Sequence, residues 1–321
     1  MANDYGPLRL SGVNYLGDLP TLVAMKEGLF QAHGLDITVN HSASGKQNLR
    51  ALRNGETDLA LMATTPLVLD LLEAPHTGEA TDPLILASLV YSSRLNHVVA
   101  LADGGIQRPE DLTNRRIGLM AGTNAEFLWW LFTSVHHIDA DTVSVVDLPV
   151  EALPDALVAG NIDAAVLWEP WTSRLSHRVN GELTLLPGSD IYIENWVLVS
   201  TRKLVEQRPD ALRRLLSAYK ESIALIEASP DRAMATYIDH AGLEAPVTLT
   251  GRDLPLFGLS LNWSLLTALM ETSQWANETT EVSIDEPPNP LSWIAPGPLH
   301  DIMPLAIGIP LPSAIDRPQT P

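Results

Sequence analysis

The chain has 321 residues, of which 45% are hydrophobic and 18% charged, so it is long enough for two lobes with buried cores. Its 20 basic and 39 acidic residues give a net charge of −19, which disfavours nucleic-acid and anionic-membrane partners because their phosphates would be repelled. Cysteine is absent, which excludes thiol catalysis, disulfides, cysteine-bound zinc and iron–sulfur clusters.

Neither a membrane span nor an export signal is visible in the sequence. No apolar run approaches the roughly 18 residues that a spanning helix needs. The start of the chain, Met1–Pro7, lacks the basic and apolar regions of a signal peptide. Two explanations stay open: a cytoplasmic protein, or an exported one whose signal was removed.

The amino-terminal part predicts strands that alternate with helices. Pro20 suits the first turn of a helix, Leu22, Met25 and Leu29 share one face of it, and Gly34 is a plausible stop. This βαβα order predicts an α/β fold with a mainly parallel sheet. The expected elements are strand 8–14, helix 20–34, strand 35–39, helix 47–53, strand 58–63 and helix 65–73.

An internal echo is the most informative feature of the sequence. Residues 51–60 (ALRNGETDLA) and 156–165 (ALVAGNIDAA) both indicate a helix end, a glycine cap, an acidic turn and a buried strand. Either turn preferences repeat here by chance, or two similar lobes direct their strand ends to one cleft. Ligands of open parallel sheets bind outside the carboxyl ends of the strands. The cleft candidates that follow these two copies are Thr64, Thr65, Trp168 and Glu169.

The second lobe is expected to begin near residues 104–109, with a helical turn at 109–112 and a strand at 116–121. Thr123 and Glu126 then form a capping-box pattern that starts a helix through Ser134. Beside Gly122, the free N–H groups of this helix start form a possible anion site. A plain helix cap is the other role of Thr123, and the two roles are compatible.

The carboxyl-terminal part predicts long helices and then a proline-rich tail. The periodicity of apolar residues predicts helices over 209–228, 230–240 and 264–276. The last 35 residues hold ten of the 24 prolines, so an extended tail on the surface is expected.

No sequence motif for catalysis is visible. The chain has no zinc-hydrolase pair of histidines, P-loop, dinucleotide-binding glycine motif or nucleophile elbow, so neither a metal nor a cofactor is predicted. Five of the eight tryptophans lie between residues 129 and 196. Trp168 and Trp171 flank Glu169-Pro170 at a strand end, where an indole can form the wall of a pocket.

Several segments together resemble the nitrate/sulfonate/taurine substrate-binding proteins of bacterial ABC importers, in the NMT1/THI5-like group of type II periplasmic binding proteins. The resemblance runs from about residue 8 to 240 and implies two Rossmann-like α/β lobes, joined by two crossover strands, with a cleft between them. It implies lobe I at 1–98 and 197–321 and lobe II at 99–196. The segments that carry it are 22–35, 52–61, 108–112, 116–124 and 156–171.

The resemblance also implies positions for the ligand site. The family's ligand turns fall after the first three strands, at the start of the lobe II helix, and on the return crossing. Arg94 is the best basic partner for a ligand anion, although a surface ion pair is an equal reading. The expected ligand-binding residues are Asn14, Tyr15, Ser42, Ser44, Thr64, Thr65, Arg94, Gly122, Thr123, Asn124, Trp168, Glu169, Tyr192 and Asn195.

The function that the resemblance implies is solute capture, without catalysis or a cofactor. A periplasmic monomer would close on a sulfonate, taurine or nitrate and deliver it to the ABC permease subunits in the membrane. A pyrimidine, a thiamine precursor or another aromatic heterocycle is an alternative ligand, and a ligand-sensing module of a receptor is an alternative role. The family's pyrimidine-synthesising enzymes depend on a cysteine-rich motif, which a chain without cysteine cannot supply.

Overall fold

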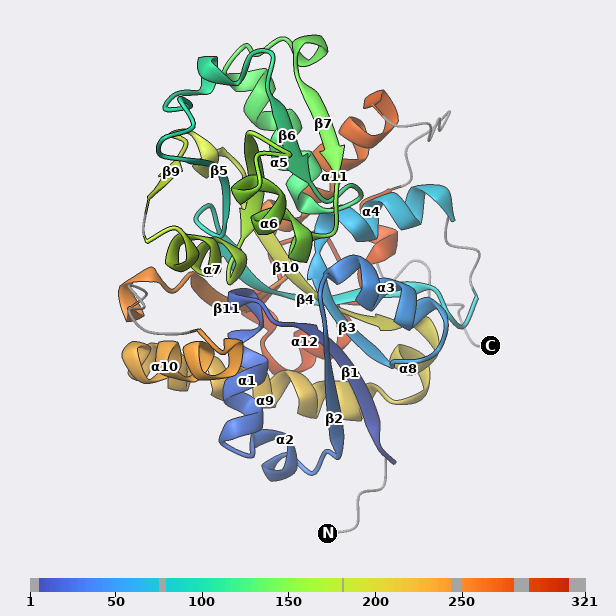
Figure 1. Ribbon diagram of the computed structural model, residues 1–321. Coiled ribbons are helices and arrows are strands. Elements are labelled where there is room, and N and C mark those ends of the chain that lie inside the picture. Colours follow the sequence, from blue (N-terminus) through green and yellow to red (C-terminus); the bar gives the residue numbers. More distant parts are fainter. Residues whose placement is uncertain (1–5, 75–78, 181, 244–249, 280–288, 312–321) are drawn as a thin grey trace.

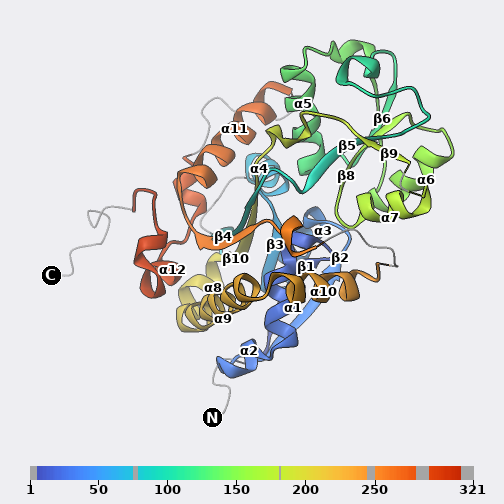
Figure 2. The ribbon, with the colours of Figure 1, turned by 90° about the vertical axis from the view of Figure 1, so that its left-hand side faces the viewer.

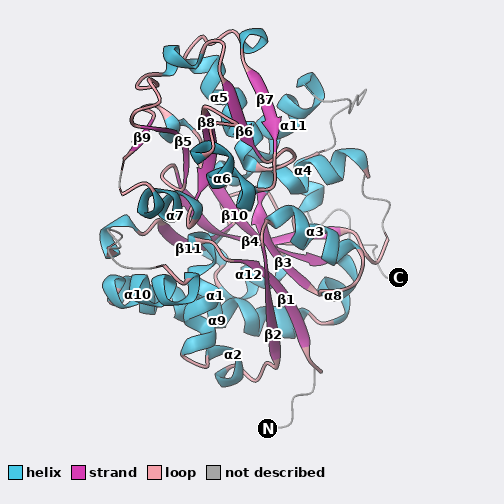
Figure 3. Ribbon diagram, viewed as in Figure 1, coloured by secondary structure: helices cyan, strands magenta, loops and turns pink. Residues whose placement is uncertain are grey.

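Two β-sheets divide the chain, as the computed structural model shows (Figures 1 and 3). The structure describes residues 6–74, 79–180, 182–243, 250–279 and 289–311. We call the part built on the six-stranded sheet lobe I and the part built on the five-stranded sheet lobe II.

Most neighbours in the two sheets are not consecutive in the sequence, as the predicted α/β fold requires. The order in lobe I is β11 (Leu256–Ser260), β4 (Pro83–Ser92), β10 (Glu194–Thr201), β3 (Leu59–Ala63), β1 (Leu8–Val13) and β2 (Ile37–Ser42). The order in lobe II is β7 (Ser144–Asp147), β6 (Arg116–Leu119), β8 (Ala164–Trp168), β5 (Asn96–Leu101) and β9 (Leu183–Leu185).

Helices cover both sheets, and none in the described part of the chain is long and apolar enough to cross a membrane. Those of lobe I are α1 (Leu19–Lys26), α2 (Leu29–Ala32), α3 (Gly45–Arg53), α4 (Thr64–Glu73), α8 (Arg202–Gln207), α9 (Pro209–Ala228), α10 (Pro230–Ala241), α11 (Trp263–Thr279) and α12 (Gly297–Ile302). Those of lobe II are α5 (Asn124–Val135), α6 (Leu153–Val158) and α7 (Trp171–Arg178).

The chain crosses between the lobes twice, once from β4 to β5 and once from β9 to β10. The sheet changes between Ser92 and Asn96 on the way out and between Leu185 and Glu194 on the way back. The lobe boundaries after residues 98 and 196 stay a prediction. Because β4 and β10 pair side by side, they form one hinge between the lobes.

The sequence echo corresponds to one structural unit that occurs in each lobe. In lobe I, Asp58 accepts hydrogen bonds from the backbone N and guanidinium of Arg9, with Nη2 to Oδ1 at 2.9 Å. In lobe II, Asp163 accepts the same set from Arg116, with Nη2 to Oδ1 at 2.8 Å. These aspartates precede β3 and β8, which pair in parallel with β1 and β6. The repeated clamp therefore fixes the central strands of both sheets in the same register.

Three expectations about elements were wrong. The sheets are not mainly parallel: of the strand pairings among the described residues, four are parallel and five, all of which involve β4, β5 or β10, are antiparallel. The helix expected over 20–34 is broken, because Gly28 takes a left-handed conformation (φ 68°) between α1 and α2. This break leaves Met25, expected on the apolar face, 43% exposed. The proline-rich tail is not simply extended either, since α12 forms within it and Trp293 and Leu299 are buried. Residues 312–321 of that tail lie outside the described residues.

Core packing in lobe II predicts a stability effect at Gly118 on β6. A Cβ atom there would lie 2.4 Å from Ile162 Cδ1 and 2.7 Å from Leu153 Cδ2, inside the core. We expect Gly118→Ala to lower the free energy of unfolding by about 1–3 kcal/mol, measured by urea denaturation, because overpacking forces core side chains to shift. Gly258→Ala on β11 is the control, since nothing lies within 4 Å of its Cβ position. Equal stability of the two variants would contradict this packing.

Candidate ligand-binding site

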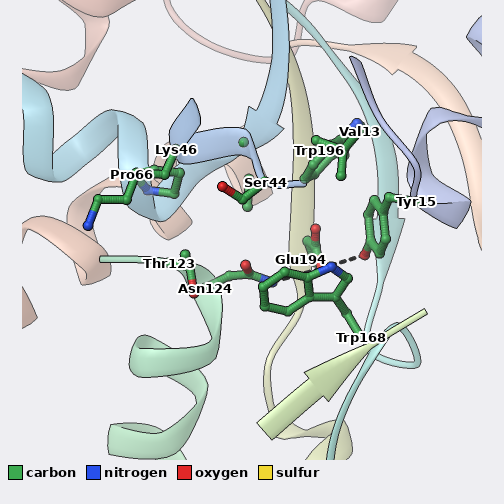
Figure 4. Close-up of a pocket in the computed structure, with 12 residues that line it drawn as sticks. Val13, Tyr15, Ser44, Lys46, Pro66, Thr123, Asn124, Trp168, Glu194 and Trp196 are labelled. Carbon is green, nitrogen blue, oxygen red and sulfur yellow. Dashed lines mark hydrogen bonds between the residues drawn. The ribbon is translucent and has the colours of Figure 1, made fainter. Parts of the chain in front are cut away.

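A small cavity lies between the lobes, where β1, β2, β3, β6 and β8 end and β10 begins (Figure 4). The centre of a water molecule can move within only about 20 Å³ of it, so the side chains nearly close the site in this conformation. This front pocket is lined by Val13, Tyr15, Ser44, Gly45, Lys46, Ala63, Pro66, Thr123, Asn124, Trp168, Glu194 and Trp196.

Glu194 lies at the centre of the polar contacts in the front pocket. It is the first residue of β10 and is fully buried. Its Oε2 accepts hydrogen bonds from the Tyr15 hydroxyl at 2.8 Å, from Asn96 Nδ2, and from Asn124 Nδ2 at 3.4 Å. Asn124 Nδ2 also donates to Asn96 Oδ1 at 2.7 Å. Tyr15 belongs to lobe I and Asn124 to lobe II, so this carboxyl group joins both lobes at the hinge.

The second oxygen of Glu194 has no such support. Oε1 is buried, and no described residue forms a hydrogen bond with it. Burial raises the pKa of Glu194 to about 7, although the hydrogen bonds from Asn96 and Tyr15 favour the ionised form. A buried acceptor without a donor is costly, so this oxygen is available to an N–H or O–H group of a ligand.

A second buried acid supports the wall of the pocket. Asp18 is fully buried and accepts hydrogen bonds from Trp196 Nε1 and from the backbone N of Val13. Burial raises its pKa to about 8. The Trp196 ring in turn packs on Tyr15, with centroids 4.7 Å apart. Asp18 thus holds in place the aromatic side chains on which Glu194 depends, without lining the pocket itself.

Lys46 brings a positive charge to the front pocket. It lies in the first turn of α3, whose N-cap Ser44 accepts a hydrogen bond from the backbone N of Gln47. Its Nζ donates to the Ala121 carbonyl of lobe II at 3.1 Å. Gly122 has a left-handed φ of 70°, and a Cβ atom there would lie 2.5 Å from Lys46 Nζ. A larger residue at position 122 would be strained by this φ and would shift the lysine ammonium group from the place where it bridges the lobes.

Five of the predicted ligand residues line the front pocket: Tyr15, Ser44, Thr123, Asn124 and Trp168. Gly122 lies at its edge, against Lys46. Thr123 is the N-cap of α5, as predicted, and accepts a hydrogen bond from the backbone N of Ala125 at 3.3 Å. The predicted capping box does not form, because Glu126 Oε2 accepts from the backbone N of Gly122 at 2.7 Å and not from that of Thr123. The Thr123 hydroxyl donates to the Met120 carbonyl at 2.7 Å.

Four predicted residues of lobe I are not among the residues that line the front pocket. Ser42 donates to Asn48 Oδ1 at 2.7 Å and so braces the turn before α3. Thr64 and Thr65 are buried in the first turn of α4, at 1% and 0% exposure. Asn14 is half-buried, and its Oδ1 has no partner among the described residues.

Arg94 and Glu169 come together in a neighbouring cavity of about 530 Å³. Glu169 is 8% exposed, and its Oε2 accepts a hydrogen bond from the backbone N of Ser173 at 3.3 Å. Burial raises the pKa of Glu169, and the charge of Asp253 adds to this effect. Trp168 and Glu169 are consecutive residues that line two different cavities, so sequence adjacency does not place both in one site.

Tyr192 and Asn195 line a third cavity, which lies on the other side of β10. Successive side chains of a strand point to opposite faces of its sheet. Glu194 and Trp196 therefore face the front pocket, whereas Asn195 faces away from it. On the return crossing, the sequence predicted Tyr192 and Asn195 as ligand residues. The residues of this segment that line the front pocket are Glu194 and Trp196.

The sequence analysis missed Lys46, Asn96, Glu194 and Trp196. One signal was available, because Glu194 lies two residues before the apolar run 196–199 of β10, and an acid in a buried strand is costly unless its carboxylate is paired. Lys46 and Asn96 carry no comparable signal, since their partners are 75 and 98 residues away along the chain. Among the described residues, no cluster of three or more histidine and acidic side chains could hold a metal.

The raised pKa of Glu194 predicts a pH-dependent stability. Between its ordinary value of 4.5 and about 7, the folded protein keeps the proton that the unfolded chain has lost. The free energy of unfolding should therefore fall as pH rises through this range, by about 3 kcal/mol from this group. Glu194→Gln removes the titration, so the stability difference, variant minus wild type, should grow with pH in urea denaturation. A difference that stays constant from pH 4.5 to 7.5 would contradict the assignment.

Comparisons with known proteins agree with this two-lobed arrangement. The family model described as NMT1/THI5 like matches residues 18–233. A candidate binding protein of Brucella abortus is 25% identical over 247 residues, 74% of each chain. A candidate aliphatic sulfonates-binding protein of Bacillus subtilis is 24% identical over 241 residues, 71% of this chain and 68% of its own.

Solved structures show the same fold. The periplasmic aliphatic sulphonate binding protein SsuA of Escherichia coli has a TM-score of 0.75 at 18% identity, covering 90% of this chain and 97% of its own. The desulfurization enzyme DSZB has a TM-score of 0.62 at 18% identity, covering 92% and 98%. The fold therefore occurs in binding proteins and in an enzyme. Because the matched segment spans most of the chain, this protein belongs to the NMT1/THI5-like family, as the sequence resemblance implied.

Proposed function

We propose that this protein is the solute-binding component of an ABC importer, which captures a small polar organic molecule and delivers it to the permease subunits in the membrane. The relatives named as binding proteins and the two-lobed fold support this role. The proposal places the protein in the periplasm, as a monomer without a cofactor. A ligand-sensing module of a receptor would use the same capture step.

Ligand capture is proposed to act through the hinge formed by β4 and β10. The front pocket takes side chains from both lobes, and Glu194 and Lys46 each form hydrogen bonds across the lobe boundary. A ligand there gains contacts with the second lobe only when the lobes close, so binding favours the closed form. The permease would then recognise that closed form.

The observation that carries the ligand class is the unpartnered Oε1 of Glu194. A nitrate or a simple alkanesulfonate beside the ionised carboxylate would place two negative charges in a dry pocket, which is unfavourable, whereas a cationic group would favour the ionised form against the burial that raises the pKa of Glu194. An amino group would instead donate to Oε1, and Lys46 at the pocket edge suits an acidic group. Within the sulfonate, taurine and nitrate class, these charges favour a small aminosulfonate such as taurine.

An aromatic heterocycle with N–H donors is the second candidate ligand. Three aromatic rings, those of Tyr15, Trp168 and Trp196, line the front pocket and can pack on a flat molecule. The same oxygen of Glu194 would accept its N–H group. The two candidates differ in what else they need, because the heterocycle depends on the rings and the aminosulfonate depends on Lys46.

Binding measurements test the proposed function. We expect taurine or an aminopyrimidine, but neither nitrate nor butanesulfonate, to raise the melting temperature and to bind in calorimetry. At about 100 times its dissociation constant a ligand adds about 2.7 kcal/mol of stability. Glu194→Gln should weaken binding about 10- to 100-fold, because a charge-assisted hydrogen bond is lost. Mass spectrometry should recover the ligand unchanged.

The matched control is Glu169→Gln, the same substitution at the buried carboxyl group of the neighbouring cavity. It should leave the affinity within about twofold of the wild type. Lys46→Gln distinguishes the two candidate ligands, since it should weaken the binding of an aminosulfonate and leave the binding of a heterocycle unchanged. Tight binding of nitrate or butanesulfonate, or an unchanged affinity in Glu194→Gln, would refute the ligand class.

A further inference from the structure

A cavity of about 630 Å³ lies behind the hinge strand β10, separate from the front pocket. This volume falls within the range of sites that hold small molecules. We call it the back groove. Its lining residues are Tyr91, Phe127, Trp130, Leu131, Ile191, Tyr192, Ile193, Asn195, Ser264, Thr267, Ala268, Glu271 and Gln274.

The walls of the back groove come from both lobes. Helix α5 of lobe II contributes Phe127 and Trp130, whose rings stack with centroids 5.9 Å apart. Helix α11 of lobe I contributes Ala268 and four polar residues, which are Ser264, Thr267, Glu271 and Gln274. In Figure 2, α11 lies on one side of the hinge strands, whereas α3, α6 and α7 lie on the other. An occupant of the groove would therefore contact both lobes from behind the hinge.

The back groove is lined by a buried side chain with a hydrogen-bond donor that no described residue pairs with. Asn195 is 2% exposed, and no described residue accepts from its Nδ2. Its Oδ1 lies 3.4 Å from Ser88 Oγ, which shares its proton between this oxygen and the Val90 carbonyl at 3.1 Å. A buried donor left unsatisfied is costly, and an oxygen of a bound molecule would remove that cost.

Apolar surface at the rim of the groove is also left uncovered. Tyr91 and Ile193 line the cavity and are 42% and 41% exposed. They extend the aromatic wall that begins with Phe127 and Tyr192, whose rings meet edge to face at 5.8 Å. Ring-shaped ligands pack well on such a wall, and a single polar donor inside it fixes their orientation.

We propose that the back groove is a second ligand site, distinct from the front pocket, for a small aromatic molecule that carries an oxygen acceptor. The ring packs between α5 and α11, and the oxygen accepts a hydrogen bond from Asn195 Nδ2. Glu194 and Asn195 are consecutive on β10, so one strand presents an acceptor to the front pocket and a donor to the back groove.

Fluorine NMR of the full chain with 4-fluoroacetanilide tests this site, because the probe combines a ring with a carbonyl oxygen. We expect saturable line broadening below about 5 mM probe, and binding at least about fivefold weaker for 4-fluoroethylbenzene, which lacks the acceptor. Ala268→Trp should fill the groove from α11 and abolish the broadening. Asn195→Ala should weaken binding about fivefold and reduce the preference for the amide probe.

Two controls locate the effect. Met270→Trp adds the same side chain to an exposed position of α11 outside the groove lining and should leave binding within about twofold. Glu169→Gln should also leave it unchanged, because Glu169 lines the cavity of about 530 Å³ and not the back groove. No saturable binding, or equal binding in Ala268→Trp, would overturn the proposal. If Asn195→Ala fails to fold, the comparison of Ala268→Trp with Met270→Trp decides it.

Discussion

The buried carboxyl group of Glu194 is the contact on which the arrangement of the front pocket depends. Three donors, from Tyr15, Asn96 and Asn124, converge on one of its oxygens. Such a network is stable only when its members stay in place, because each lost donor leaves another buried polar group unsatisfied. The hinge, lobe I and lobe II therefore meet at one carboxyl group, and its remaining oxygen is the acceptor on which the proposed ligand class rests.

The two buried acids at the front pocket are held by neutral donors rather than by cations. Asp18 takes its hydrogen bonds from Trp196 and the Val13 backbone, and Glu194 takes its own from a tyrosine and two asparagines. Without a cationic partner, burial keeps the pKa of each group high. A positive or N–H group of a ligand beside Glu194 would favour its ionised form, and this is the contact that the proposed function assigns to it.

The fold places these side chains through a repeated local unit. The pairs Arg9–Asp58 and Arg116–Asp163 clamp equivalent strands in the two sheets, so the strand ends of each lobe arrive at the same interface. Both pairs are partly exposed, and their value lies in geometry more than in stability. The echo of residues 51–60 in 156–165 was visible in the sequence because the same turn requires the same glycine and aspartate.

The sequence by itself determined the α/β class, the two similar units and most helices, because periodicity, glycine caps and proline positions are local signals. Helix α9 begins and ends where its proline and apolar period predicted. Only the tertiary structure decided which polar residues share a pocket. Trp168 and Glu169 separate into two cavities, as do Glu194 and Asn195, since side-chain direction depends on strand ends and the pleat of β10. Lys46, Asn96 and Glu194 meet partners far away in the sequence, and no local pattern records such contacts.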